Sequence, residues 1–264
     1  MGNISAYQEK EVLMIKDGEK KYFADTVATE YPLTIFFNDK EIITLLCTPD
    51  KLENLALGFL FSEGFLEDKG EVSQLYLDKE NGIVYVNTVK EKSLADKLYG
   101  KRTITTGCGK GTVFFSAWDA LKSKKINSEM QINASTILKH MHSLQSLSSL
   151  YKQTGGVHSA ALADLQQLMY ICEDVGRHNA VDKIVGECLD KGAKLHDKVL
   201  ICSGRLSSEM LMKTAKLGIP VLVSRAAPTT LSVEVADAMG VSLVGFVRGA
   251  RLTVYSHSRR IVHN

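Results

Sequence analysis

The first part of the chain alternates short runs of β-branched and aromatic residues with polar turns, a pattern typical of β-strands. One segment has helical spacing instead: apolar residues recur from Leu52 to Leu60, and Gly64 ends the helix. The expected strands are Leu33–Phe37, Glu41–Cys47, Val72–Leu77, Ile83–Val89 and Arg102–Thr106. The pattern therefore predicts a small α+β unit.

In the second part of the chain, strands and helices alternate. A helix is expected from Ser135, with the apolar residues from Ile137 to Tyr151 on one stripe. The strands expected after it are Leu168–Glu173, Lys198–Cys202, Val221–Ser224 and Ser242–Phe246, and the helices are His178–Leu189, Ser207–Leu217 and Thr230–Met239. Because parallel strands need long crossover connections, this alternation predicts an α/β domain with a mainly parallel sheet covered by helices.

The change of pattern divides the chain into two domains. We place a small α+β domain at residues 1–106 and a larger α/β domain at residues 107–264, of which residues 107–130 form a catalytic loop and connection. The composition, 45% hydrophobic and 23% charged, is that of a globular protein. A net charge of +2 provides no general attraction to nucleic acid or to a membrane, so any anion site is local. Without an apolar run long enough for a membrane span or signal peptide, the protein is expected to be cytoplasmic.

The five cysteines are widely spread and have neither a Cys-x-x-Cys pair nor a histidine at zinc-finger spacing, so no structural metal is expected. Four of them lie in apolar segments, where cysteine usually acts as a small buried hydrophobic residue. These four are Cys47, Cys172, Cys188 and Cys202. Cys108 differs, because the segment from Thr105 to Thr112 has almost no apolar residue to bury it.

The segment around Cys108 is rich in glycine. A Walker A phosphate loop is excluded, because Gly111 rather than Ser or Thr follows Lys110. The flanking Gly107 and Gly109 leave the sulfur accessible, and Lys110 can lower the pKa of the thiol from about 8.5. We interpret Cys108 as a thiolate that attacks a substrate or carries a transferable atom. The alternative is a glycine-rich turn with an incidental cysteine.

Three successive strand ends of the larger domain carry an arginine beside small polar residues. Ligands of open α/β sheets bind beyond the carboxyl ends of the strands, where helix N-termini present their amides. The candidate phosphate-binding residues are Arg177, His178, Ser203, Arg205, Ser224 and Arg225. The alternative is structural: Ser207 and Thr229 are good helix caps, and Asp174 with Arg177 is a local ion pair.

A fourth segment, Phe246–Arg251, has two cations beside a glycine and suits an anionic ligand, or forms a solvated hairpin turn. His158 and His178 are the histidines best placed for chemistry. The zinc deaminase signature, His-x-Glu with a later Pro-Cys-x-x-Cys, does not occur in the sequence, nor does the Gly-x-Ser-x-Gly of hydrolases.

Long motifs connect these segments: Glu173–Lys183 (EDVGRHNAVDK), Ser203–Arg205 with Ser208–Met210, and Ala227–Thr229. With these motifs the chain resembles the formate dehydrogenase accessory sulfurtransferase family, FdhD. The resemblance implies a cytidine-deaminase-like three-layer fold without zinc ligands. It also implies a sulfurtransferase that takes sulfur from a cysteine desulfurase as a cysteine persulfide. The sulfur passes to the molybdenum cofactor, the bis-molybdopterin guanine dinucleotide, before insertion into the formate dehydrogenase catalytic subunit.

The resemblance implies that Cys108 carries the persulfide. It also implies that the cofactor touches Phe246, Val247, Arg248, Gly249, Ala250 and Arg251, and that a guanine nucleotide mimics half of it. The second cysteine of the family loop is Gly111 here, which puts in doubt a resolving thiol. The rival hypotheses are a binding chaperone with a silent Cys108 and a deaminase relic that hydrolyses nucleotides. A homodimer is expected from base rates.

Overall fold

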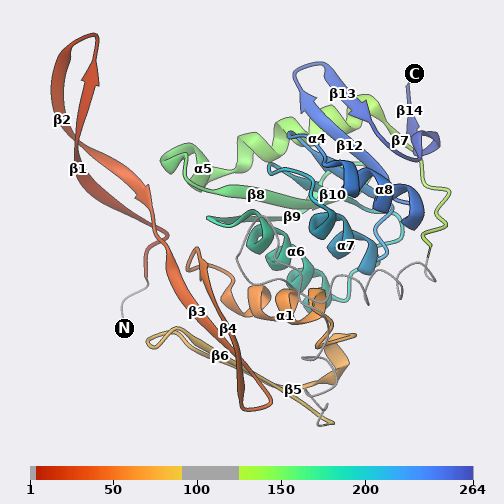
Figure 1. Cartoon of the computed structure of the whole chain (residues 1–264), viewed down its shortest axis with the longest axis horizontal. Helices are drawn as coiled ribbons and strands as arrows, with labels where there is room; N and C mark the ends of the chain where they lie inside the picture. The colour runs from red at the N-terminus through yellow and green to blue at the C-terminus, as the bar shows by residue number, and fades with distance from the viewer. Residues whose placement is uncertain (1–3, 91–124, 264) are drawn as a thin grey trace.

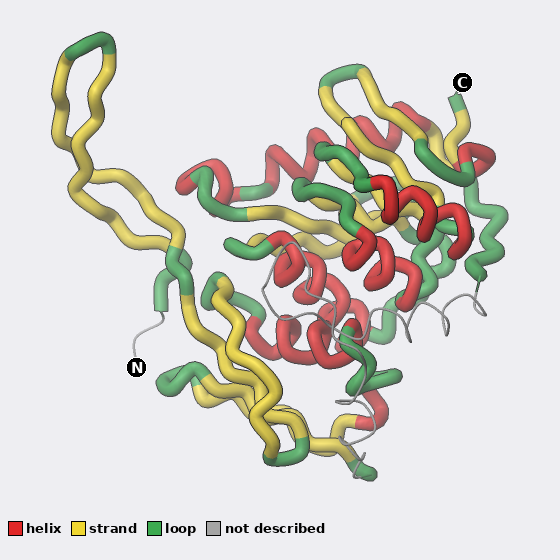
Figure 2. The backbone as a smooth tube through the Cα atoms, viewed as in Figure 1, coloured by secondary structure: helices red, strands yellow, loops and turns green. Residues whose placement is uncertain are grey.

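The computed structural model describes residues 4–90 and 125–263. A six-stranded sheet forms the centre of the larger unit (Figures 1 and 2). Its spatial order is β13 (Arg251–Val254), β12 (Ser242–Arg248), β11 (Val221–Ser224), β10 (Val199–Cys202), β8 (His158–Ala163) and β9 (Leu168–Asp174). The strands expected after Leu168 are confirmed, whereas β8 and β13 were missed.

The sheet is mixed, so the prediction of a mainly parallel sheet was wrong. Only β10–β11 and β11–β12 are parallel, while β8–β10, β8–β9 and β12–β13 are antiparallel. The cause is β8, whose alanine-rich sequence hides it from a search for β-branched residues. A turn from Asp164 to Gln167 joins β8 to β9, and so short a connection permits only antiparallel pairing.

Helices cover both faces of this sheet. On one face lies α4 (Ala134–Leu147), whose Ile137, Met141 and Leu144 are buried against the sheet. The other face is covered by α6 (Arg177–Lys191), α7 (Ser208–Lys216) and α8 (Thr230–Met239). The sheet thus lies between two helical layers, and all three helices expected after Arg177 are confirmed within two residues.

The N-terminal unit has a four-stranded sheet and one helix, as the pattern predicts. The strand order is β4 (Lys40–Cys47), β3 (Tyr31–Phe37), β6 (Ile83–Thr88) and β5 (Val72–Asp78), the last preceded by the turn η1 (Lys69–Glu71). The helix α1 (Leu52–Ser62) packs between this sheet and α6. The fifth expected strand, Arg102–Thr106, and the boundary at residue 106 lie outside the described residues.

Two glycines let α1 and α6 approach closely. A Cβ atom added to Gly58 would lie 1.8 Å from the carbonyl oxygen of Asp182, and one added to Gly186 would lie 1.9 Å from that of Asn54. No side chain fits between backbones at such distances. The two helices join the cores of both units into one continuous hydrophobic cluster.

An N-terminal hairpin, β1 (Tyr7–Lys16) with β2 (Glu19–Ala28), projects away from the rest of the molecule (Figure 1). At the other end of the chain, β14 (Ile261–Val262) pairs with β7 (Ile132–Asn133) after the turn η2 (Ser258–Arg260). Arg260 is buried there and donates hydrogen bonds to the carbonyl oxygens of Gly240 and Ser128.

Candidate functional site

The polar strand ends singled out from the sequence meet at one edge of the six-stranded sheet. Strands β9, β10, β11 and β12 all end there, and β8 begins there. The edge therefore gathers Arg177 and His178 after β9, Ser203 and Arg205 after β10, Ser224 and Arg225 at β11, and the segment Phe246–Arg251 at β12. At roughly 4.8 Å per strand, β9 and β12 lie about 19 Å apart along this edge.

Hydrogen bonds tie the neighbouring loops together. The Leu206 amide donates to the carbonyl oxygen of Ala227 at 3.0 Å, and the Phe246 amide donates to that of Ala226 at 3.1 Å. The Arg248 Nε donates to the carbonyl oxygen of Arg225 at 3.0 Å. Ser224 is fully buried, and its hydroxyl donates to the carbonyl oxygen of Gly204. The Ser224 side chain thus holds the loops in place and is closed to a ligand.

The hairpin between β12 and β13 presents its cations to solvent. Arg248, Gly249, Ala250 and Arg251 are exposed, whereas the side chain of Val247 belongs to the core. Phe246 has a φ of 52°, in the left-handed region that favours glycine. Its ring lies 5.8 Å from the Arg248 guanidinium and 5.5 Å from that of Arg251, so both cations stack near one aromatic face.

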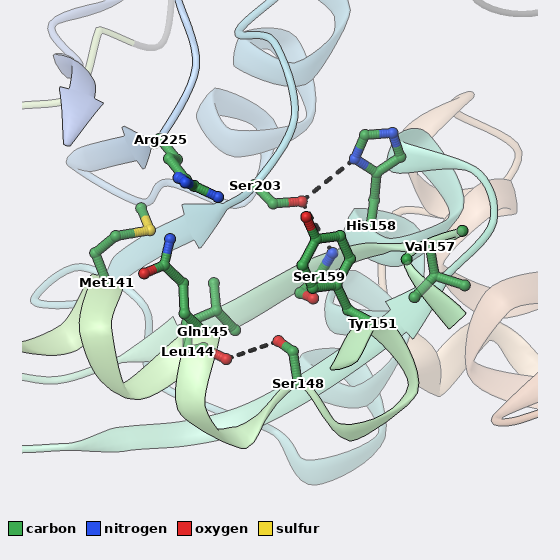
Figure 3. A pocket seen from close by; sticks show the side chains of 12 residues that line it. Met141, Leu144, Gln145, Ser148, Tyr151, Val157, His158, Ser159, Ser203 and Arg225 are labelled. Carbon is green, nitrogen blue, oxygen red and sulfur yellow. Dashed lines mark hydrogen bonds between the residues drawn. The ribbon is translucent and has the colours of Figure 1, made fainter. Parts of the chain in front are cut away.

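A cavity of about 320 Å³ opens at this edge between α4, the following turn and the sheet. Ser203 and Arg225 line it together with His158, as Figure 3 shows. The Ser203 Oγ accepts a hydrogen bond from the Ser159 amide at 3.0 Å and lies 3.3 Å from the His158 Nδ1. The strand ends β8, β10 and β11 thus bring three candidate residues to one hollow.

His158 is held neutral by its surroundings. Burial lowers the pKa of its imidazole below the ordinary 6.5, and the neighbouring charge of Arg177 and the ring of His178 lower it further. Because the Ser203 Oγ already accepts from the Ser159 amide, its own proton is free to point at the His158 Nδ1. In that arrangement the remaining proton of the neutral ring is on Nε2, which makes Nε2 a hydrogen-bond donor.

The wall of the cavity contains a break in the helix that the sequence pattern did not predict. The apolar stripe from Ile137 to Tyr151 is interrupted at Ser148, where α4 ends and α5 (Ser149–Thr154) begins. The Glu173 carboxylate accepts hydrogen bonds from the amides of Leu150 and Tyr151, at 3.0 and 2.9 Å, and so caps α5. Tyr151 is consequently 44% exposed at the cavity instead of buried in the core.

Arg177 and His178 lie behind the cavity, at the start of α6. The Arg177 side chain packs on Gly204, where an added Cβ would lie 3.0 Å from the Arg177 Cβ. Its Nε and Nη2 atoms are buried and have no hydrogen-bond partner among the described residues. The His178 Nε2 lies 3.0 Å from a carboxylate oxygen of Glu209. Of this pair, Arg177 is the one with donors available for a ligand.

The rest of the motif 173–183 is structural. Asp174 and Lys183 are both fully buried and lie 2.7 Å apart, so the expected Asp174–Arg177 ion pair was wrong. Asp174 also accepts from the Thr48 amide at 3.0 Å, and Lys183 donates to the carbonyl oxygen of Thr48 at 3.1 Å. Sequence reasoning missed Thr48, because nothing near it in the chain indicates a partner so distant in sequence.

The two expected helix caps behave differently. Thr229 caps α8, with Thr229 and Ser232 each bonding the other's backbone amide. Ser207 occupies the cap position of α7, but its hydroxyl makes no hydrogen bond there and is buried without a partner among the described residues. Plain capping therefore explains the loop after β11 but not the loop after β10.

The four cysteines in apolar segments are all buried, as predicted. Burial raises the pKa of Cys47, Cys172 and Cys188 to about 12 and that of Cys202 to about 11. None of these thiols is ionised near neutral pH. Cys108 and its neighbours Gly107, Gly109 and Lys110 lie outside the described residues.

Two further searches cover the described residues only. Among them, no group of three or more His, Cys, Asp or Glu side chains could hold a metal ion. None of their helices has both the length and the apolar character needed to cross a membrane.

Fold and edge together define a mixed α/β protein with a cavity and exposed arginines at one end of its central sheet. Residues 28–262 match the family described as FdhD/NarQ. The chain belongs to the FdhD/NarQ family, which confirms the resemblance in its sequence.

Similar proteins are known from several organisms. Over 252 residues the chain is 40% identical to the sulfur carrier protein FdhD of Bacillus subtilis, with 96% of each chain covered. The protein of the same name from Listeria monocytogenes is 42% identical over 238 residues, 89% of this chain and 91% of that one. A crystal structure from Desulfotalea psychrophila, of a protein assigned as a formate dehydrogenase accessory protein, has a TM-score of 0.79 and 26% identity. It covers 98% of this chain and 100% of that chain.

Proposed function

We propose that this protein is a sulfur carrier that serves formate dehydrogenase. In the finer form of the proposal, it is a sulfurtransferase whose Cys108 accepts sulfur from a cysteine desulfurase as a persulfide. The sulfur then passes to the molybdenum cofactor, bound as substrate in its bis-molybdopterin guanine dinucleotide form. The names of the similar proteins support the coarser role, and the finer steps rest on the sequence and on the site.

The observation that carries the proposal is the state of the other cysteines. A persulfide carrier needs an accessible sulfur that ionises near neutral pH. Four of the five cysteines are buried and have raised pKa values, so they fail both conditions. Cys108 is the remaining cysteine, and its flanking glycines and Lys110 suit the role.

The sheet edge supports binding of the cofactor. A dinucleotide has several phosphates and is long, and the edge offers exposed arginines over about 19 Å between β9 and β12. We propose that Arg177, Ser203, Arg205, Arg225 and the segment Phe246–Arg251 contact it. A guanine nucleotide would occupy part of the same edge.

Other parts of the proposal rest on the sequence alone. They are a cytidine-deaminase-like larger domain, a domain boundary at residue 106, action in the cytoplasm, contact with the dehydrogenase catalytic subunit, and a homodimer. The alternative function is a non-catalytic chaperone that binds the cofactor while Cys108 is silent. Gly111, in place of a second loop cysteine, favours that alternative.

Mass spectrometry separates the carrier from the chaperone. The full chain is incubated with a cysteine desulfurase and cysteine, and the peptides are analysed without a reductant. We expect one added sulfur on Cys108, none in Cys108→Ser, and unchanged loading in Cys202→Ala. Loading of Cys202 or of no cysteine in the wild type would overturn the carrier role.

A further inference from the structure

The cavity beside α4 has two kinds of wall. Met141, Leu144 and Val157 are buried apolar residues, and they form one part of its lining. The rest is polar and comes from α4, α5 and the strand ends. At about 320 Å³, the cavity is at the lower end of the roughly 300–1,000 Å³ typical of small-molecule sites. It can hold one fused ring, but not a whole dinucleotide.

Three polar side chains at this cavity have unused hydrogen-bonding groups. The Gln145 amide, the Tyr151 hydroxyl and the Arg225 guanidinium have no hydrogen-bond or ion-pair partner among the described residues. Figure 3 shows Arg225, Met141 and Gln145 on one side of the cavity, with Tyr151 and His158 across from them. Apolar walls with a few convergent polar groups are the usual form of a site for a planar ligand.

The chemistry of these groups differs along the cavity. Gln145 offers one donor and one acceptor side by side, which match the edge of an amide-containing ring. Tyr151 offers an aromatic face and a hydroxyl, and Arg225 offers a cation for phosphate. Arg225 begins the loop that is hydrogen-bonded to the loop of Arg205 through Leu206 and Ala227. A phosphate at Arg225 would therefore continue toward the other arginines of the edge.

We propose that this cavity is the ring subsite for a phosphorylated fused nitrogen heterocycle, with Gln145 contacting the ring edge and Arg225 the first phosphate. The inference rests on the proposed function, because guanine and pterin, the two rings of the proposed substrate, both carry an amide edge. It adds α4 and α5 to a site that the sequence placed only at strand ends. Gln145 and Tyr151 are the residues that determine ring recognition.

Calorimetry with two probes tests the ring subsite in the full chain. GDP contains the ring and phosphates, whereas inorganic pyrophosphate has only the phosphates. We expect Gln145→Leu to weaken GDP binding about tenfold, which corresponds to about 1.4 kcal/mol, and to leave pyrophosphate binding unchanged. Arg225→Ala should weaken both probes. The matched controls are Gln166→Leu, in the turn at the opposite edge of the sheet, and Arg259→Ala.

Equal binding of GDP and pyrophosphate by the wild type, no binding of GDP, or unchanged GDP binding in Gln145→Leu would overturn the proposal. Photolabelling of the wild type with 8-azido-GDP avoids any folding defect of a variant. Label in the peptide that contains Met141 to Tyr151 supports the subsite, and label confined to Phe246–Arg251 overturns it.

A competition experiment identifies the ring. Displacement of GDP by pterin-6-carboxylate would show that the subsite accepts a pterin as well as guanine, and no displacement would assign it to guanine. Sulfur loading of Cys108 without nucleotide is measured separately. Failed loading with intact GDP binding contradicts the proposed function alone, and the reverse result contradicts only the ring subsite.

Discussion

Charged side chains gather at two places in this protein, and the two places differ in how the charges are paired. At the junction between the N-terminal unit and α6, Asp174 and Lys183 are fully buried and contact each other. At the edge of the six-stranded sheet, the guanidinium groups of Arg205 and Arg225 are exposed and have no ion-pair partner in the described part of the chain. One motif, residues 173–183, contributes to both places.

The comparison separates two reasons for a charged residue. A buried charge without a partner is very unfavourable, so the junction charges are needed for the fold itself. An exposed charge contributes little to stability, so the edge arginines are available for binding. Substitutions at the junction should therefore lower the free energy of unfolding, and substitutions at the edge should lower ligand affinity.

The largest effect is expected for Lys183→Met. It leaves the Asp174 carboxylate buried without its cation, and the free energy of unfolding should fall by about 3–5 kcal/mol. Urea denaturation measures this loss. The double variant Asp174→Asn with Lys183→Met should recover most of it, because no charge is then left unpaired. A loss below about 1 kcal/mol in Lys183→Met would end the distinction between junction and edge.

A slightly smaller loss is expected for Gly186→Ala. The new Cβ would lie 1.9 Å from the carbonyl oxygen of Asn54, so α1 and α6 must separate. We expect a loss of about 3 kcal/mol, more than the gain of about 1 kcal/mol in helix propensity. Gly156→Ala is the control, since its Cβ would meet only the Ala28 Cβ, at 3.4 Å. Equal thermal stability of both variants would show that the helices do not need their close approach.

At the edge, Arg205→Ala should change affinity without changing stability. Loss of a charge-assisted contact to phosphate should weaken GDP binding by about 1.5–3 kcal/mol, while the free energy of unfolding stays within about 0.5 kcal/mol of the wild type. Calorimetry and urea denaturation on the same samples test both statements. The exposed Arg259→Ala serves as the control for charge alone. Destabilisation of Arg205→Ala to the extent of Lys183→Met would contradict the comparison.

The smallest effect depends on pH and concerns Glu63, beside the junction. Burial raises the pKa of its carboxyl to about 7, an effect opposed by Lys213 and Lys216 and reinforced by Asp182 and Glu209. Between about pH 4.5 and 7 the unfolded chain ionises this group and the folded chain does not, so stability falls as pH rises.

Glu63→Gln removes this ionisation. The variant should be more stable than the wild type by about 2 kcal/mol at pH 8, and the difference should shrink toward pH 5. Urea denaturation at both pH values measures the difference. A constant difference across the range would assign the gain to a contact of the new amide instead of to ionisation.

The local sequence predicts the elements well, because helices and strands follow from spacing that neighbouring residues determine. The helix from Leu52 ends before Gly64, and the helix from Thr230 to Met239 has the expected bounds. The four apolar cysteines are buried as expected, since a run of apolar neighbours is a reliable sign of a core position. The polar strand ends were also identified from the sequence.

Contacts between distant segments decided the rest. The pairing of Asp174 with Lys183 around Thr48, the cap of α5 by Glu173, and the place of Gln145 at the cavity join residues far apart in the chain. The direction of β8 likewise came from pairing in the sheet rather than from its own alanine-rich sequence. The sequence by itself determined which residues carry charge, sulfur and apolar surface. The tertiary structure alone decided which charges are paired and which remain free, because pairing depends on distance in space, and local periodicity contains no information about that distance.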